Sequence, residues 1–154
     1  MRLLGLDVDT HKIAWSIFED EEYVESGVFA PKASLAWQER IKHIAAWLND
    51  FLAHRKPEAV AYEVASGNRG NMATHRKLGA VEWACWREGW FWAEDWIEVN
   101  VQHAKQTGCH KHAIVVAEGI AGKRIDHRYA EDEADAIGCA LAALRKIKEE
   151  SLCS

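Results

Sequence analysis

The chain has 154 residues, 28% of them charged, and a formal net charge of -5. This length fits a single domain over residues 1–154, with one core that buries about two-thirds of the surface of the unfolded chain. No run of about 18 apolar residues occurs, and Asp7 interrupts the apolar start, which argues against a membrane span and a secretory signal. We therefore expect a cytoplasmic protein.

Taken in chain order, the sequence begins with three short β-prone runs. They span residues 3–9, 12–19 and 22–29 and are joined by short polar turns, which predicts an antiparallel meander. A helix follows, with Ser34 as its N-cap and apolar residues at helical spacing as far as the break at Lys56-Pro57.

The rest of the chain alternates strands and helices. The pattern predicts a strand at 59–65, a helix at 72–88, a strand at 96–101, a short helix at 112–118 and a final helix at 131–149. The order βββαβαβαα predicts an α/β fold in which helices flank both faces of a mixed five-stranded sheet.

Four carboxylates stand in contexts that suit one metal site. Asp7 and Glu63 lie in β-prone apolar runs, where an acid is unexpected unless it faces water, a partner or a cation. Asp132 and Asp135 are three residues apart on a predicted helix, so they project from one face and repel each other. A cation removes that repulsion, and Mg²⁺ takes few carboxylates and binds phosphate oxygens. The pattern therefore predicts a divalent-metal nuclease.

Ordinary structural roles remain open for some of these acids. Asp132 and Asp135 also suit a helix N-terminus, where the helix dipole favours negative charge. Glu131 or Glu133 takes the place of one of them if the helix begins in a different register. Asp9 is better suited to forming the turn after the first strand than to binding the metal directly.

Basic residues gather in two stretches of this net acidic chain, at 66–78 and 101–129. The first contains a glycine- and asparagine-rich loop that precedes a helix, where backbone N–H groups hold phosphate. The second contains Cys109, His110 and His112, whose spacing matches no standard structural zinc site. The candidate DNA-binding residues are Arg69, Arg76, Lys77, Lys105 and Lys111.

These motifs together resemble the RuvC family of Holliday junction resolvases, in the RNase H-like superfamily. The resemblance rests on the order of GLDVDT in the first strand, Glu63 ending the fourth, TG after the fifth and DEADA opening the last helix. It implies a homodimeric endodeoxyribonuclease that resolves four-way DNA junctions with symmetric paired nicks. It also implies two Mg²⁺ ions per active site, or Mn²⁺ in their place, with Asp7, Glu63, Asp132 and Asp135 as catalytic ligands.

The sequence departs from that family at Ser66, where several relatives carry an aromatic residue that wedges into the junction. It also carries an aromatic stripe, because Trp83, Trp86 and Trp90 recur at helical spacing. In the resembling family the corresponding helix packs against its two-fold mate, which implies a dimer contact here. Core packing and base stacking remain open for the same residues.

Other functions fit parts of the pattern. An RNase H-like nuclease for another branched or hybrid nucleic acid would use the same acids. A DEDD-type transposase would need a further domain, and we expect none because the chain stops soon after Asp135. A nucleotide-binding fold of the actin and sugar-kinase type would need two lobes and a longer chain. An inactive DNA-binding module would leave the four acids without a role.

Overall fold

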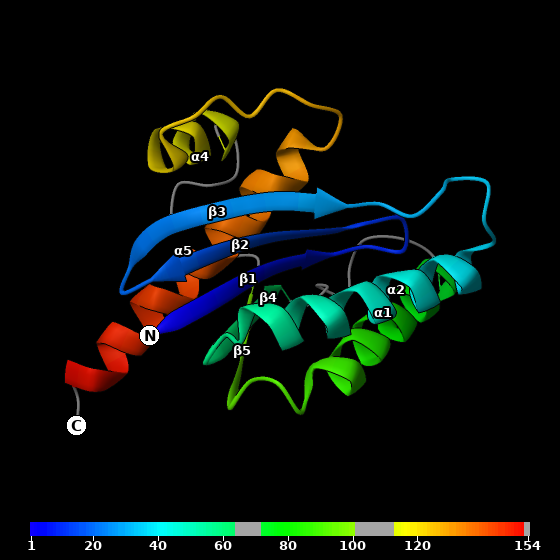
Figure 1. The fold of residues 1–154 in the computed structure, drawn as a ribbon, viewed down its shortest axis with the longest axis horizontal. Helices are drawn as coiled ribbons and strands as arrows, with labels where there is room; N and C mark the ends of the chain where they lie inside the picture. The colour runs from blue at the N-terminus through cyan, green and yellow to red at the C-terminus, as the bar shows by residue number, and fades with distance from the viewer. Residues whose placement is uncertain (64–71, 101–112, 153–154) are drawn as a thin grey trace.

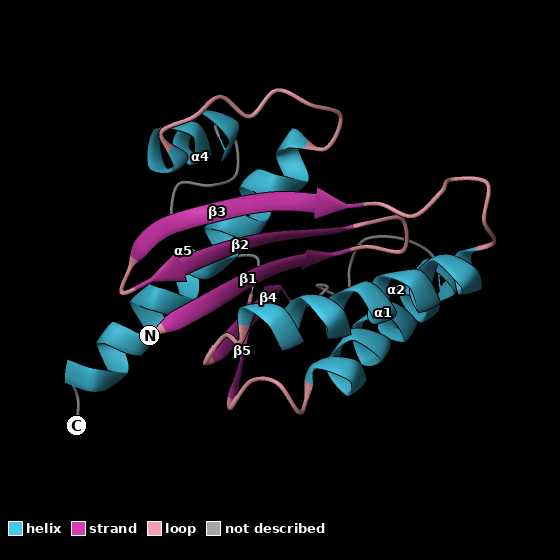
Figure 2. Cartoon of the chain, in the orientation of Figure 1, coloured by secondary structure: helices cyan, strands magenta, loops and turns pink. Residues whose placement is uncertain are grey.

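In the computed structural model, residues 1–63, 72–100 and 113–152 are described. Within them, a five-stranded mixed sheet forms the middle layer, with helices on both faces (Figures 1 and 2). This arrangement confirms the predicted α/β architecture. No described helix is long and apolar enough to cross a membrane.

The sheet has the strand order β3-β2-β1-β4-β5. β1 (Arg2–Val8), β2 (Ile13–Glu19) and β3 (Glu22–Phe29) form the predicted antiparallel meander. β4 (Ala59–Glu63) pairs parallel with β1, and β5 (Asp95–Val99) pairs parallel with β4. The carboxyl ends of β1, β4 and β5 therefore meet at one edge of the sheet.

Two helices, α1 (Trp37–Arg55) and α2 (Met72–Gly89), cover one face of the sheet (Figure 1). Their apolar sides pack against alternate residues of each strand, because successive side chains of a strand point to opposite faces of the sheet. The core on this face includes Leu4, Leu6, Ile13, Ile17, Val60, Ile44, Leu48 and Val81.

The predicted N-cap of the first helix, Ser34, is wrong. Ser34 lies in a turn in which the Leu35 N–H donates to the Lys32 carbonyl at 3.1 Å. The Arg40 guanidinium donates to the Leu35 carbonyl at 2.8 Å and so stabilises this turn against joining the helix. The helix begins later, with Ala36 at the N-cap position and no side-chain cap hydrogen bond.

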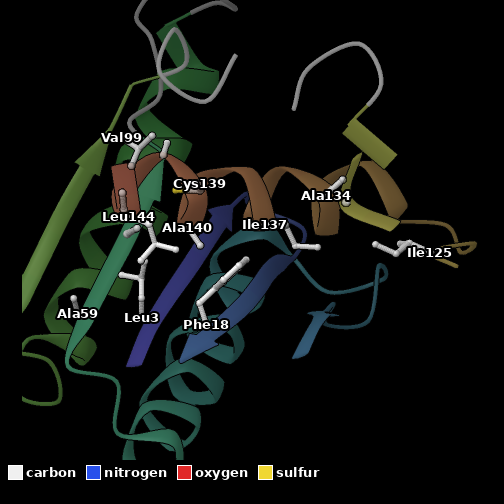
Figure 3. Packing of buried hydrophobic residues seen from close by; sticks show 14 of the residues in the cluster. Leu3, Phe18, Ala59, Val99, Ile125, Ala134, Ile137, Cys139, Ala140 and Leu144 are labelled. Atoms are coloured by element: carbon white, nitrogen blue, oxygen red, sulfur yellow. The ribbon is translucent and has the colours of Figure 1, made fainter. Parts of the chain in front are cut away.

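The other face of the sheet is covered by α4 (Ala113–Ala121) and α5 (Ala130–Leu152). Figure 3 shows Ala140 of α5 lying towards Leu3 and Phe18 of the sheet, whereas Ala134 lies nearer to α4 and Ile125. Both helices were predicted within a few residues of their observed bounds.

The closest approach of α5 to the sheet is at Gly5 of β1. A Cβ atom at Gly5 would lie 2.4 Å from the Ala136 carbonyl oxygen and 2.8 Å from the Ala140 Cβ. Ser16, paired with Gly5 on β2, donates from its hydroxyl to the same Ala136 carbonyl at 2.9 Å. Because the backbones nearly touch here, the N-terminal turns of α5 are fixed in place over the end of β1.

Candidate active site

Asp7 lies near the carboxyl end of β1, on the sheet face that α5 covers. Side chains alternate along a strand, so Asp7 shares its face with Leu3 and Gly5. Leu3 is part of the core beneath α5, and Gly5 contacts α5 directly. Beyond Gly5 the same row of the strand therefore carries a carboxylate instead of an apolar group.

Glu63 ends β4 in an equivalent position. It follows Ala59 and Ala61 in the row that faces α5. The parallel register of β1 and β4 pairs Leu6 with Tyr62, so Asp7 and Glu63 come next to each other at the ends of neighbouring strands. Such strands are about 4.8 Å apart, which places the two acids side by side.

Asp132 and Asp135 complete the group from the first turns of α5. Burial, together with the charges of Asp135 and Asp132, raises the pKa of Asp7 to about 8. Burial, together with the charges of Glu63 and Asp132, raises the pKa of Asp135 to about 6. The charges of the four predicted carboxylates therefore act on one another, so these acids lie near each other at this end of the sheet.

A cavity of about 250 Å³ opens beside these acids. Asp7, Glu63 and Asp132 line it, and α2 contributes Leu78 and Glu82 to its wall. The site therefore lies at the sheet edge where β1, β4, α2 and α5 meet, open to a ligand from outside.

Lys12 is the site residue that sequence reasoning missed. Its Nζ lies 2.9 Å from Asp132 Oδ1 and 3.1 Å from Asp9 Oδ2, and its side chain is only 12% exposed. The available signal was the short turn between β1 and β2, which returns Lys12 to the end of the strand that carries Asp7.

Asp9 forms that turn. Its N–H donates to the Lys12 carbonyl at 3.0 Å, and its carboxylate accepts the N–H of Thr10. Burial raises the pKa of Asp9, but Lys12 and Thr10 outweigh burial and hold this pKa below its usual value. Asp9 thus has the turn-forming position that its sequence context favours.

Glu133 points to a different part of the protein. Its side chain is 5% exposed, and its carboxylate accepts hydrogen bonds from Ser26 of β3 and from His127 Nε2, the latter at 2.6 Å. Lys123 adds a weaker ion pair at 3.6 Å. Through these hydrogen bonds Glu133 links α5 to β3 and faces away from the site. Glu131, the other alternative acid, is exposed to solvent. The structure therefore favours Asp132 and Asp135 as the site acids of α5.

The residue types suit a hard divalent cation, because carboxylate oxygens are its preferred ligands and Lys12 neutralises only part of the negative charge. In residues 1–63, 72–100 and 113–152, no three His, Cys, Asp or Glu side chains are grouped tightly enough to hold a metal ion.

The raised pKa values give a pH dependence with a definite sign. Folded Asp7 and Asp135 bind protons more tightly than in the unfolded chain, so the free energy of unfolding falls as pH rises from about 4 towards about 8. In EDTA we expect the thermal midpoint to drop between pH 6 and pH 8. Asp7→Asn should flatten this slope, and an equal slope in wild type and variant would contradict the assignment.

The predicted DNA-binding residues are only partly described. Arg76 is exposed on α2, and the Nζ of Lys77 lies 5.8 Å from the ring centroid of Trp37. Other candidates from the sequence lie outside the described residues, namely Arg69, Lys105, Lys111, Ser66, Cys109, His110 and His112.

The aromatic stripe of α2 forms part of the molecular surface. Trp83 is 60% exposed and Trp90 54% exposed. The rings of Trp83 and Trp86 stack with centroids 5.3 Å apart, and those of Trp86 and Trp90 lie 4.6 Å apart. Large contiguous aromatic surface of this kind is uncommon on a monomer.

No protein-family model and no curated protein matches the chain. Solved structures match it over almost its full length. Thermus thermophilus RuvC in complex with a Holliday junction substrate is 20% identical, with a TM-score of 0.81, and the match covers 97% of this chain and 96% of that one. The chain has the RuvC fold. The fold that the sequence resemblance implied is thereby confirmed.

Two other resolvases share this fold more distantly. The yeast mitochondrial Holliday junction resolvase is 13% identical with a TM-score of 0.63, over 93% of this chain and 77% of that one. The fowlpox virus resolvase, solved with its substrate Holliday junction DNA, is 13% identical with a TM-score of 0.53, over 96% of this chain and 99% of that one.

Proposed function

We propose that residues 1–154 form a single nuclease domain that resolves four-way DNA junctions by metal-dependent hydrolysis of phosphodiester bonds. The observation that supports this most is the convergence of Asp7, Glu63, Asp132 and Asp135 at one edge of the sheet. Two neighbours with the same RuvC fold were solved with Holliday junction DNA, which favours a branched substrate.

The four carboxylates would act chiefly as ligands. Asp7, Glu63, Asp132 and Asp135 would hold two Mg²⁺ ions, and Mn²⁺ would substitute. When bound, such ions would supply a hydroxide nucleophile and stabilise the leaving 3′ oxygen. Without a cation, these four acids repel the phosphate backbone. We therefore expect the scissile phosphate to enter the site only when metal is bound.

Basic residues near the site would hold the DNA arms. Arg76 lies exposed on α2, the helix that forms one wall of the cavity. Arg69, Lys77, Lys105 and Lys111 belong to the same proposed contact set. A protein with net charge -5 needs such a local basic face, because its overall charge disfavours binding to a polyanion.

Paired symmetric nicks require two active sites related by a two-fold axis, so we propose a homodimer built on the tryptophan stripe. We expect a double substitution, Trp83→Glu with Trp90→Glu, to convert a dimer to a monomer in light scattering. Val24→Glu is the matched control, because Val24 is 48% exposed on β3, away from the stripe. A double variant that stays dimeric would place the interface elsewhere.

A cytoplasmic location belongs to the same proposal. Of the chain's four cysteines, the two in the described residues, Cys85 and Cys139, are buried and free, as is usual in a reducing compartment.

The proposed function is tested by incubating the protein with a synthetic four-way junction and a matched linear duplex, in Mg²⁺, Mn²⁺ or EDTA. We expect paired nicks in the junction alone, lost in EDTA. Metal-dependent cutting of flaps or RNA–DNA hybrids in place of the junction would redirect the assignment to another RNase H-like nuclease. Binding without cutting would indicate an inactive DNA-binding module.

A further inference from the structure

Lys12 brings a cation of the protein's own into the carboxylate site. Its ammonium lies between two acids from different elements, Asp9 in the β1–β2 turn and Asp132 at the start of α5. The ion pair with Asp132 therefore joins residues 120 positions apart in the chain. This contact sets a positive charge directly against one of the four site acids.

The surroundings hold Lys12 in this position. The turn fixes its backbone through the hydrogen bond from Asp9 N–H to the Lys12 carbonyl. Tyr129 places its ring 5.8 Å from Nζ, and the side chain is largely buried. An ammonium held at several points and shielded from water interacts more strongly than a surface lysine.

We infer that Lys12 is an internal counterion that occupies Asp132 in the metal-free protein and leaves it when a divalent cation binds. This inference rests on the proposed metal site. A dication beside Asp132 would repel the ammonium, and the Asp132 oxygen that accepts from Nζ would be the one needed as a ligand. Lys12 thus competes with the metal, stabilises the empty site and raises the metal concentration that the site requires.

The opposite role would leave a different signature. If Lys12 only oriented Asp132 for the metal, as supporting hydrogen-bond partners of ligands do, removing it would weaken metal binding. Competition and orientation therefore predict opposite signs for the same substitution.

The test measures Mn²⁺ binding to the DNA-free protein by electron paramagnetic resonance, so that it does not depend on cleavage. For Lys12→Met we expect the Kd for Mn²⁺ to fall about tenfold, equivalent to about 1.4 kcal/mol. Lys12→Arg keeps the charge and should bind Mn²⁺ as weakly as wild type. Lys42→Met removes an exposed lysine paired with Glu39 on α1 and should change nothing.

Thermal unfolding of the same variants gives a second readout. In EDTA, Lys12→Met should unfold at a lower temperature than wild type, because acid repulsion is no longer relieved, and Mn²⁺ should restore more stability to it than to wild type. If Lys12→Met does not fold, Lys12→Gln removes the same charge with a polar side chain and should lower the Kd in the same way.

The outcomes separate this inference from the proposed function. An Mn²⁺ Kd that is unchanged or higher in Lys12→Met, with wild type still binding, would overturn only the role of Lys12. Failure of both wild type and Lys12→Met to bind Mn²⁺ would overturn the metal site itself, and the inference with it. Binding by Lys12→Met alone would support strong competition.

Discussion

Asp7→Asn is expected to abolish metal-dependent cleavage, lowering the rate by about a thousandfold or more, while junction binding is retained or becomes tighter. Together with burial, the charges of the other three site acids all raise the pKa of Asp7, which places Asp7 among them, and its carboxylate would help to hold the cations. An amide keeps the shape of the side chain but loses the charge that holds a cation. The removal of one negative charge from the DNA-facing site accounts for the retained binding.

The same substitution should stabilise the metal-free protein. Because burial and neighbouring acids raise the pKa of Asp7 to about 8, its ionised form is unfavourable in the folded state near neutral pH. We expect the thermal midpoint in EDTA at pH 8 to rise by several degrees. Asp50→Asn, an exposed site on α1, is the control and should leave both cleavage and stability unchanged. Retained turnover of Asp7→Asn in Mg²⁺ would remove Asp7 from the site.

Gly5→Ala is expected to destabilise the fold strongly. The added Cβ would meet the backbone of α5, at 2.4 Å from the Ala136 carbonyl oxygen, where no flexible side chain gives way. Overpacking of this kind costs about 1–3 kcal/mol, and we expect the upper part of that range. The helix must shift away from β1, so Asp132 and Asp135 would move relative to Asp7. Displacements near 1 Å in such constellations cost about a hundredfold in rate.

Urea denaturation in EDTA measures the loss of stability in Gly5→Ala, and Mn²⁺ binding measures the displacement of the α5 acids from Asp7. Gly79→Ala is the matched control, because a Cβ at Gly79 on α2 has nothing within 4 Å. In an exposed helix it should stabilise by about 0.5–1 kcal/mol. Equal stability of Gly5→Ala and wild type would show that α5 does not depend on this close approach.

The sequence was informative where the surroundings of a residue follow from the hydrophobic pattern of its own strand or helix. Asp7 and Glu63 each interrupt an apolar β-prone run, which marked both as candidate site residues, and the structure places both in strand rows that face α5. Asp132 and Asp135 were placed by helical spacing. Neither step required knowledge of the tertiary contacts.

What the sequence could not provide depends on contacts between distant segments. Ser34 is a good cap by type, but Arg40 stabilises a turn there instead. Lys12 reads as an ordinary turn lysine until α5 brings Asp132 to within 2.9 Å of its Nζ. From the sequence, Gly5 is only a residue of low strand propensity. The structure shows that α5 packs directly against its Cα and leaves no space for a side chain.

The most direct test of the central claim is a crystal structure of the protein soaked with Mn²⁺, with the ions located by anomalous scattering. The account predicts two peaks about 3.5–4 Å apart among Asp7, Glu63, Asp132 and Asp135, with Lys12 no longer paired to Asp132. Mn²⁺ bound elsewhere, with the four acids unliganded and Lys12 still on Asp132, would contradict it.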